Sequence, residues 1–422
     1  MPLRWVIVCL LLAATTINYI DRQALSVAAP VLRDEFNLSN SQYGTITATF
    51  LAAYALGQLV GGRIIDRLGT RLAFSLAVLL WSAAAMGHAL ARGFTSLLVA
   101  RAGLGLFESA NYPAATKAVA EWMPKAERGM AVAVITIGPG LGAILAPPVV
   151  GALILYSGWQ SAFLVTGALG LIWLFIWRRL YHPPERHPRL SDAERRQLLG
   201  ERLTGPGDRP IPTRDLLLRR DMLGLILARF VADGSFYFYV FWLPLYLADE
   251  QGFNVGDIAV FAWLPFVAAD LGSLAAGWLS ERLVRRGVSI NAARKGLIWI
   301  GAVCAVVGLY AVVAGQAWQA VAAISGALFF IQFRASQTFA LPADMFPARD
   351  VASVWGVYGA AGSLGGMLTT QAVGWAADLS GYTPVFVAMA GLPLLSALAI
   401  SVFVPNLDDR QRALAAPPAR HS

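Results

Sequence analysis

Long apolar stretches recur along the whole chain, and each is long enough to cross a lipid bilayer as a helix. At roughly 20 residues per span, they predict twelve transmembrane helices, over 5–27, 42–61, 72–91, 95–117, 130–153, 158–178, 221–248, 256–281, 293–314, 317–341, 351–376 and 381–404. The polar segments divide the chain into a six-helix bundle over 1–178, a cytoplasmic linker over 179–220, a second six-helix bundle over 221–404 and a cytoplasmic tail over 405–422.

Composition supports an all-α integral membrane protein. Of 422 residues, 57% are hydrophobic and only 14% are charged, whereas soluble domains carry roughly 25% charged residues. The two cysteines, Cys9 and Cys304, lie far apart in apolar runs, which predicts no disulfide framework. The four histidines form no cluster with ligand spacing, so we expect no metal and no cofactor.

The net charge of +8 follows the topology and does not indicate nucleic-acid binding. Arginines crowd the segment 178–220, and the other loops on that side also carry basic residues, whereas the opposite loops hold only Arg33 and Arg92. Cytoplasmic loops hold the excess of Lys and Arg, so both termini are predicted to be cytoplasmic. In the linker, Ser191 and Glu194 have capping-box spacing, which predicts a short helix whose basic face lies on anionic lipid headgroups.

Two charged residues interrupt the first apolar run, Asp21 and Arg22. Charges inside a membrane are costly and usually pair or line a substrate or ion path. The fourth predicted helix adds Arg101 and Glu108, seven residues apart and therefore on one face. Arginine suits an organic anion, and a carboxyl group that takes up protons near neutral pH suits proton coupling. The alternative is that Asp21–Arg101 and Arg22–Glu108 are structural ion pairs.

An internal repeat supports the division into two halves. The segment Gly62–Gly69 after the second helix is echoed by Gly277–Leu283 after the eighth. The segment Glu121–Pro124 is likewise echoed by Asp344–Pro347. Halves repeated in parallel are the architecture of major facilitator transporters, and the loop Gly62–Arg71 resembles the signature of that superfamily.

A narrower resemblance rests on shorter motifs. The stretch Asn18–Arg22 (NYIDR) resembles the anion:cation symporter family, whose bacterial members include hexuronate and galactonate permeases. The same resemblance is carried by Gly105–Ser109, Phe241–Pro244 and Ala268–Gly272.

The resemblance implies roles for residues at matching positions. It implies that Asp21 and Glu108 couple protons, and that Arg22 contacts the substrate carboxylate beside Tyr19 and Tyr54. We include Arg101, level with Asp21, in the substrate site. It also implies a cytoplasmic gate that contains Asp66, Arg67, Arg71 and, in the second half, Glu281.

The second half contributes further candidates. Ser336 and Thr338 match positions that bind the sugar acid in galactonate-type relatives, and Ser363 is a candidate hydroxyl contact in a glycine-rich helix. Arg334 falls outside the family pattern; we expect it to contact the anion or to pair with Asp270, and the alternative is an arginine that extends to the cytoplasmic interface. Arg229 and Asp233, four residues apart, can satisfy each other.

The prediction is a proton-coupled symporter that imports a small organic anion, a hexuronate or related sugar acid, by alternating access. We expect a monomer in a bacterial cytoplasmic membrane, with the proton gradient as co-substrate and no nucleic-acid partner. A proton-coupled drug or metabolite antiporter is the alternative, because the Gly138–Pro139 pair resembles the signature of such exporters. A membrane-embedded enzyme or sensor lacks support, since no nucleophile–base set appears.

Overall fold

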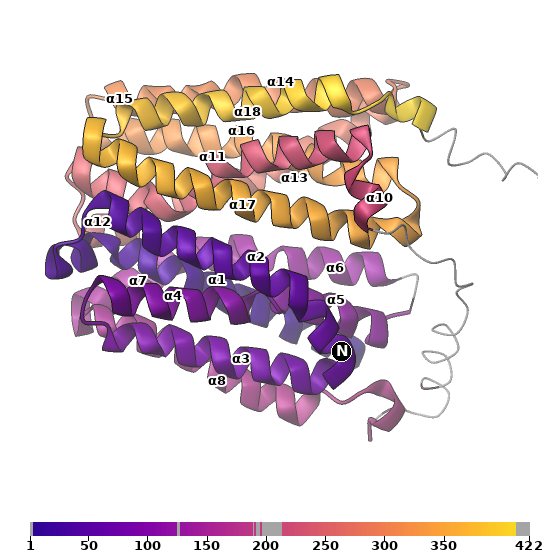
Figure 1. Ribbon diagram of the computed structural model, residues 1–422, viewed down its shortest axis with the longest axis horizontal. Coiled ribbons are helices and arrows are strands. Elements are labelled where there is room, and N and C mark those ends of the chain that lie inside the picture. Colours follow the sequence, from indigo (N-terminus) through magenta and orange to yellow (C-terminus); the bar gives the residue numbers. More distant parts are fainter. Residues whose placement is uncertain (1–2, 125–126, 189, 191–194, 196–212, 411–422) are drawn as a thin grey trace, which may run out of the picture. The chain divides into compact units, whose positions relative to one another are not determined.

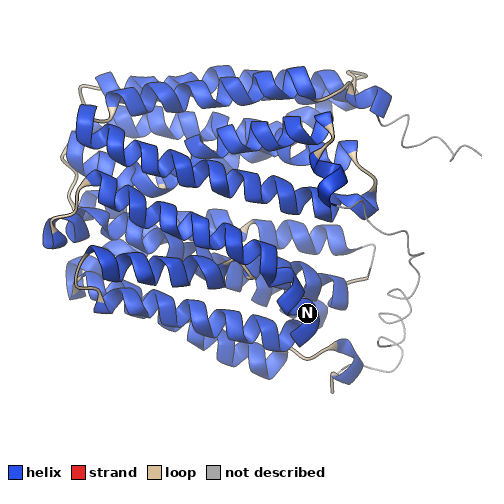
Figure 2. Ribbon diagram, in the orientation of Figure 1, coloured by secondary structure: helices blue, strands red, loops and turns tan. Residues whose placement is uncertain are grey.

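The computed structural model describes residues 3–124, 127–188, 190, 195 and 213–410. These residues form helices joined by short loops, with no strand among them (Figure 2). The helix predicted to begin at Ser191 lies outside the described residues, as do most of the predicted linker and residues 411–422 of the predicted tail. Nine helical stretches of the described chain are long and apolar enough to cross a membrane.

The chain divides into two compact units. The first comprises Met1–Gly207 together with Val240–Trp263, and the second comprises Asp208–Tyr239 together with Leu264–Ser422. One long helix, α11 (Arg220–Gln251), therefore contributes its beginning to the second unit and its end to the first. The boundaries of the two predicted six-helix bundles stay a prediction.

The first unit holds the helices of the N-terminal half, the end of α11 and the short helix that follows it (helices labelled in Figure 1). Its other elements are α1 (Leu3–Phe36), α2 (Asn40–Leu68), α3 (Thr70–Gly87), η1 (His88–Leu90), α4 (Phe94–Glu108), α5 (Asn111–Trp122), α6 (Arg128–Thr136), α7 (Gly138–Ser157), α8 (Trp159–Leu180), η3 (Pro184–Arg186) and α12 (Val255–Phe261).

The second unit holds the remaining helices. Besides the start of α11, they are α10 (Thr213–Leu217), α13 (Leu264–Arg285), α14 (Ile290–Cys304), η4 (Ala305–Leu309), α15 (Tyr310–Val313), α16 (Ala317–Met345), α17 (Ala348–Ser380) and α18 (Thr383–Phe403). Within this unit α14 packs against both α16 and α18.

Local sequence explains where several helices begin and break. Ser39 caps α2 and forms a reciprocal capping box with Gln42. Gly69 joins α2 to α3 with φ +77°, a conformation that glycine adopts without strain. The predicted helix 130–153 is divided into α6 and α7 at Ile137, and Pro139 occupies the first turn of α7. Proline is favoured there because it lacks the N–H that a first turn leaves unbonded.

Glycines bring helices into close contact in both units. A methyl group on Gly105 of α4 would lie 2.3 Å from the carbonyl oxygen of Phe50 on α2. A methyl group on Gly272 of α13 would lie 2.0 Å from the carbonyl oxygen of Phe329 on α16. In each half, therefore, the second and fourth predicted spans pack backbone to backbone through a glycine. This shared arrangement agrees with the internal repeat in the sequence.

Candidate functional site

A buried ion pair joins α1 to α4 in the first unit. Arg22 donates to Oε2 of Glu108 from Nη2 at 3.3 Å and from Nε at 3.4 Å. The two side chains are 2% and 0% exposed. The helices position this pair because Arg22 and Glu108 both lie on faces turned into the unit.

Aromatic rings surround the same guanidinium. Its central carbon lies 4.4 Å from the ring centroid of Tyr19, 4.9 Å from that of Phe50 and 4.8 Å from that of Tyr54. Phe50 and Tyr54 lie one turn apart on α2 and stack on each other. Ring faces attract cations, most strongly where water is excluded. Rings and carboxylate together keep the cation in place inside the unit.

Arg101 and Asp21 lie beside this pair but do not form an ion pair with each other. Arg101 donates from Nη2 to the backbone carbonyl of Arg22 at 3.2 Å, and its guanidinium lies over Phe50. Asp21 is 1% exposed, and within the described residues neither of its carboxyl oxygens accepts a hydrogen bond. Of the two structural ion pairs considered as an alternative, the structure contains Arg22–Glu108 and lacks Asp21–Arg101.

A buried hydrogen bond between polar side chains lies nearer the beginning of α1. Asn111, at the start of α5, donates to the hydroxyl of Thr15 at 3.2 Å. Glycines of α7 pack on this side of α1, since a methyl group on Gly138 would lie 2.8 Å from Cβ of Thr15 and one on Gly142 would lie 2.5 Å from Cβ of Tyr19. The glycine motif of the fifth predicted helix therefore allows close approach to the residues that hold Arg22.

In the second unit, Arg334 is buried and bonded to hydroxyl groups. Its Nη1 donates to Ser396 at 3.0 Å and to Thr338 at 3.4 Å. The structure does not pair it with Asp270, and its burial to 3% exposure argues against an arginine extended to solvent. Ser336 donates to the carbonyl of Phe333. Ser363 is buried on α17.

The predicted gate residues of the first unit have separate partners. Asp66 pairs with Lys117 at 2.7 Å, and Arg71 donates to the carbonyl of Arg178 at 2.6 Å. Arg67 makes no hydrogen bond or ion pair with the part of the chain that the structure describes. The predicted gate residue of the second unit, Glu281, pairs with Arg285 one turn later.

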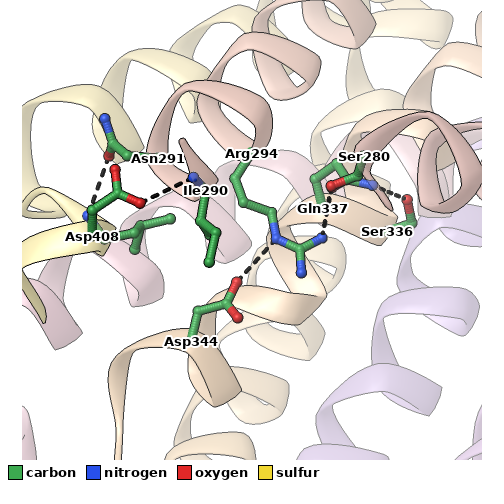
Figure 3. Close-up of polar contacts among 9 residues, drawn as sticks. Ser280, Ile290, Asn291, Arg294, Ser336, Gln337, Asp344 and Asp408 are labelled. Carbon is green, nitrogen blue, oxygen red and sulfur yellow. Dashed lines mark hydrogen bonds and ion pairs between the residues drawn. The ribbon is translucent and has the colours of Figure 1, made fainter. Parts of the chain in front are cut away.

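The two echoed acidic residues make equivalent contacts in their units. Glu121 accepts a hydrogen bond from Thr70 in the first turn of α3 at 2.7 Å. Asp344 pairs with Arg294 in the first turns of α14 at 3.0 Å, and Arg294 also donates to Gln337 (Figure 3). In each unit, an acidic residue before the sequence Trp-Met-Pro or Met-Phe-Pro links the ends of two helices.

Comparison with known proteins identifies the family of the chain. The Major Facilitator Superfamily profile matches residues 11–342. The chain belongs to the Major Facilitator Superfamily. It is therefore a multi-pass membrane transporter and not an enzyme, and the predicted fold class is confirmed.

Relatives within the superfamily include sugar-acid transporters. The hexuronate transporter of Escherichia coli (strain K12) is 33% identical over 412 residues, which cover 96% of this chain and 94% of the relative. The galacturonate transporter of Dickeya chrysanthemi is 36% identical over 306 residues, which cover 71% and 88%. The predicted resemblance to hexuronate-type permeases is confirmed.

A solved structure supports the fold alone. The D-xylose-proton symporter aligns over 95% of this chain and 98% of its own with a TM-score of 0.76, at 17% sequence identity.

Some residues of the site were absent from the sequence prediction. Phe50 contacts both Arg22 and Arg101, and its position one turn before Tyr54 on α2 was the available signal. Lys117, at the end of the predicted helix 95–117, had no predicted role, but it pairs with Asp66. Ser396, on the last helix, carried no signal, because one serine in an apolar span usually bonds to its own helix.

Proposed function

We propose that this protein is a proton-coupled symporter that imports a hexuronate or a related sugar acid by alternating access. The observation that carries the proposal is the buried Arg22, which a carboxylate and three ring faces hold within a membrane-spanning unit. Arg22 would bind the substrate carboxylate, and Tyr19 and Tyr54 would contact the sugar ring. The names of the hexuronate and galacturonate transporters support this choice of substrate.

In this proposal two carboxyl groups carry the protons. Glu108 holds Arg22 in the empty protein and releases it when protonated, so that a substrate carboxylate takes its place. Asp21 is buried without a hydrogen-bond partner among the described residues. A buried carboxyl group that lacks a partner is far less costly when uncharged, which suits a group that gains and loses a proton.

The remaining parts of the proposal follow the superfamily and the charge pattern. Arg101 would belong to the substrate site and would fix the backbone of Arg22 through its hydrogen bond to the Arg22 carbonyl. The cytoplasmic gate would contain Asp66, Arg67, Arg71 and Glu281. Ser336, Thr338 and Ser363 would offer hydroxyl contacts. The protein would act as a monomer in a bacterial cytoplasmic membrane with both termini inside, and would need no cofactor besides the proton gradient.

Uptake into proteoliposomes tests the proposal. With an inward proton gradient, wild-type protein should accumulate glucuronate above its external concentration, and Asp21→Asn should abolish this accumulation. The control is Asp34→Asn, which changes an exposed aspartate near the end of the same helix. Normal accumulation by Asp21→Asn would refute the coupling role, and efflux driven by the inward gradient would favour the antiporter.

A further inference from the structure

The second unit contains a buried charged cluster that the proposed symport mechanism does not use. Arg229 and Asp233 lie one turn apart on α11, with 2.7 Å between Nε and Oδ2. Arg334 on α16 and Tyr358 on α17 lie within electrostatic range of this pair. The cluster holds two cations and one anion, and so carries a net positive charge.

Packing places these side chains against one another. The guanidinium of Arg229 lies over the rings of Phe339, at 4.3 Å, and Tyr358, at 5.0 Å. Gly362 on α17 leaves room for the pair, because a methyl group there would lie 2.1 Å from Oδ2 of Asp233. Three helices of the unit, α11, α16 and α17 (labelled in Figure 1), thus meet at Arg229.

Arg334 is tied to the same helix through a serine. Its Nη1 donates to Ser396 on α18, and the hydroxyl of Ser396 donates in turn to the carbonyl of Ala228 at 2.9 Å. Ala228 is the neighbour of Arg229 along α11. The contacts therefore tie Arg334 to the turn of α11 that carries Arg229.

Donors outnumber acceptors in the cluster. Nε of Arg334 is buried and has no hydrogen-bond partner within the described chain, and the buried hydroxyl of Tyr358 interacts with Arg229. Both residues are at least nine-tenths buried. An unmet buried donor on a guanidinium, together with the net positive charge of the cluster, favours an acceptor with negative charge, which is the chemistry of a carboxylate.

We propose that Arg229, Arg334 and Tyr358 form a carboxylate-binding site within the second unit, and that Asp233 occupies Arg229 until the ligand carboxylate replaces it. Glucuronate carries one carboxylate, so this site and Arg22 would hold it in turn during transport, and in this respect the inference rests on the proposed function. Asp233 is then a positioning residue, and the direction of its effect on affinity can be predicted. Removing its charge should strengthen anion binding, whereas removing one partner of a purely structural ion pair would not.

Titration calorimetry with glucuronate on the purified full-length protein tests this inference, with galactose as the uncharged probe. Asp233→Asn should bind glucuronate about tenfold more tightly than wild type, since a charged hydrogen bond is worth enough to shift binding tenfold. Arg334→Gln should bind it about tenfold more weakly. The control is Asp221→Asn, which removes an ion-paired aspartate from the first turn of the same helix and should leave the affinity unchanged.

The calorimetry results distinguish failure of this inference from failure of the proposed function. If wild type binds glucuronate but both variants match it within twofold, the carboxylate site is refuted and the proposed function stands. If wild type binds no glucuronate, the proposed function fails and this inference fails with it. If Asp233→Asn does not fold, the double variant Arg229→Gln/Asp233→Asn restores charge balance, and it should bind about tenfold more weakly than wild type.

Discussion

Replacing Glu108 by glutamine tests whether charge holds Arg22 in place. Glutamine keeps the shape of the protonated carboxyl group and removes the negative charge. At the observed 3.3 Å between Nη2 and Oε2, an effective dielectric constant of about 20 gives an attraction on the order of 5 kcal/mol. Removing one partner of a buried pair costs about 3–5 kcal/mol, because the other charge stays buried. We expect a loss of stability in that range.

Thermal unfolding of the detergent-solubilised protein measures this loss. For a unit of this size, each kcal/mol shifts the midpoint by about 2–4 °C, so Glu108→Gln should lower it by roughly 6–20 °C. The control is Asp66→Asn, which breaks an ion pair whose side chains are 74% and 29% exposed. Exposed pairs contribute about 0–1 kcal/mol, so the control should shift the midpoint by no more than about 4 °C.

Added glucuronate separates a structural pair from a substrate site. In Glu108→Gln no internal carboxylate competes for Arg22, so the ligand should raise the midpoint by more than it does in wild type, as expected when ligand binds the folded state more tightly. A midpoint for Glu108→Gln that matches the Asp66→Asn control would show that charge does not hold Arg22. An equal ligand effect in both proteins would remove Glu108 from the binding site.

Two further predictions concern packing. Gly105→Ala should lower the free energy of unfolding by about 1–3 kcal/mol, because the added methyl group overpacks α4 against α2. The same variant should weaken glucuronate binding in calorimetry, since the methyl group forces Phe50 away from Arg22. The control is Gly103→Ala, whose added methyl group would lie 3.5 Å from its nearest neighbour and should change neither quantity. Leu407→Ala removes a fully buried side chain after the last long helix and should cost about 2–5 kcal/mol in unfolding. Leu379→Ala, at an 85% exposed position, is its control, and equal midpoints would contradict the burial of residue 407.

The length of the apolar runs was enough to predict the helices, because a bilayer sets the number of residues that each span needs. All twelve predicted ranges fall on helical elements of the structure. The breaks were not predicted. The ranges 95–117, 130–153 and 256–281 are each divided in two, at Ser109–Ala110, Ile137 and Ala262–Trp263. Hydropathy stays high through such breaks, so it carries no sign of them.

The contacts of the candidate site were predicted in part. Arg22 and Glu108 could be identified because a charge inside an apolar span is rare and has few available partners. The pairing of Asp21 with Arg101 could not be decided, because adjacent residues on a helix point about 100° apart, and packing alone determines which of Asp21 and Arg22 faces α4. Phe50 and Tyr358 were missed, because aromatic residues in a membrane span usually serve in packing.

One physical explanation covers both arginine–carboxylate pairs, the fully buried Arg22–Glu108 and the largely buried Arg229–Asp233. A bare guanidinium inside a membrane protein would be too costly to keep, and an arginine bound permanently to its partner would be useless to a transporter. In the proposed mechanism, an internal carboxylate on Arg22, and another on Arg229, would stabilise the empty protein and would be exchanged in turn for the carboxylate of the ligand at similar energy. A neutral sugar brings no charge to replace the displaced carboxylate, so exchange would leave the arginine unpaired. In that mechanism, selectivity for anions would arise from the free-energy penalty on neutral competitors as much as from attraction to the substrate.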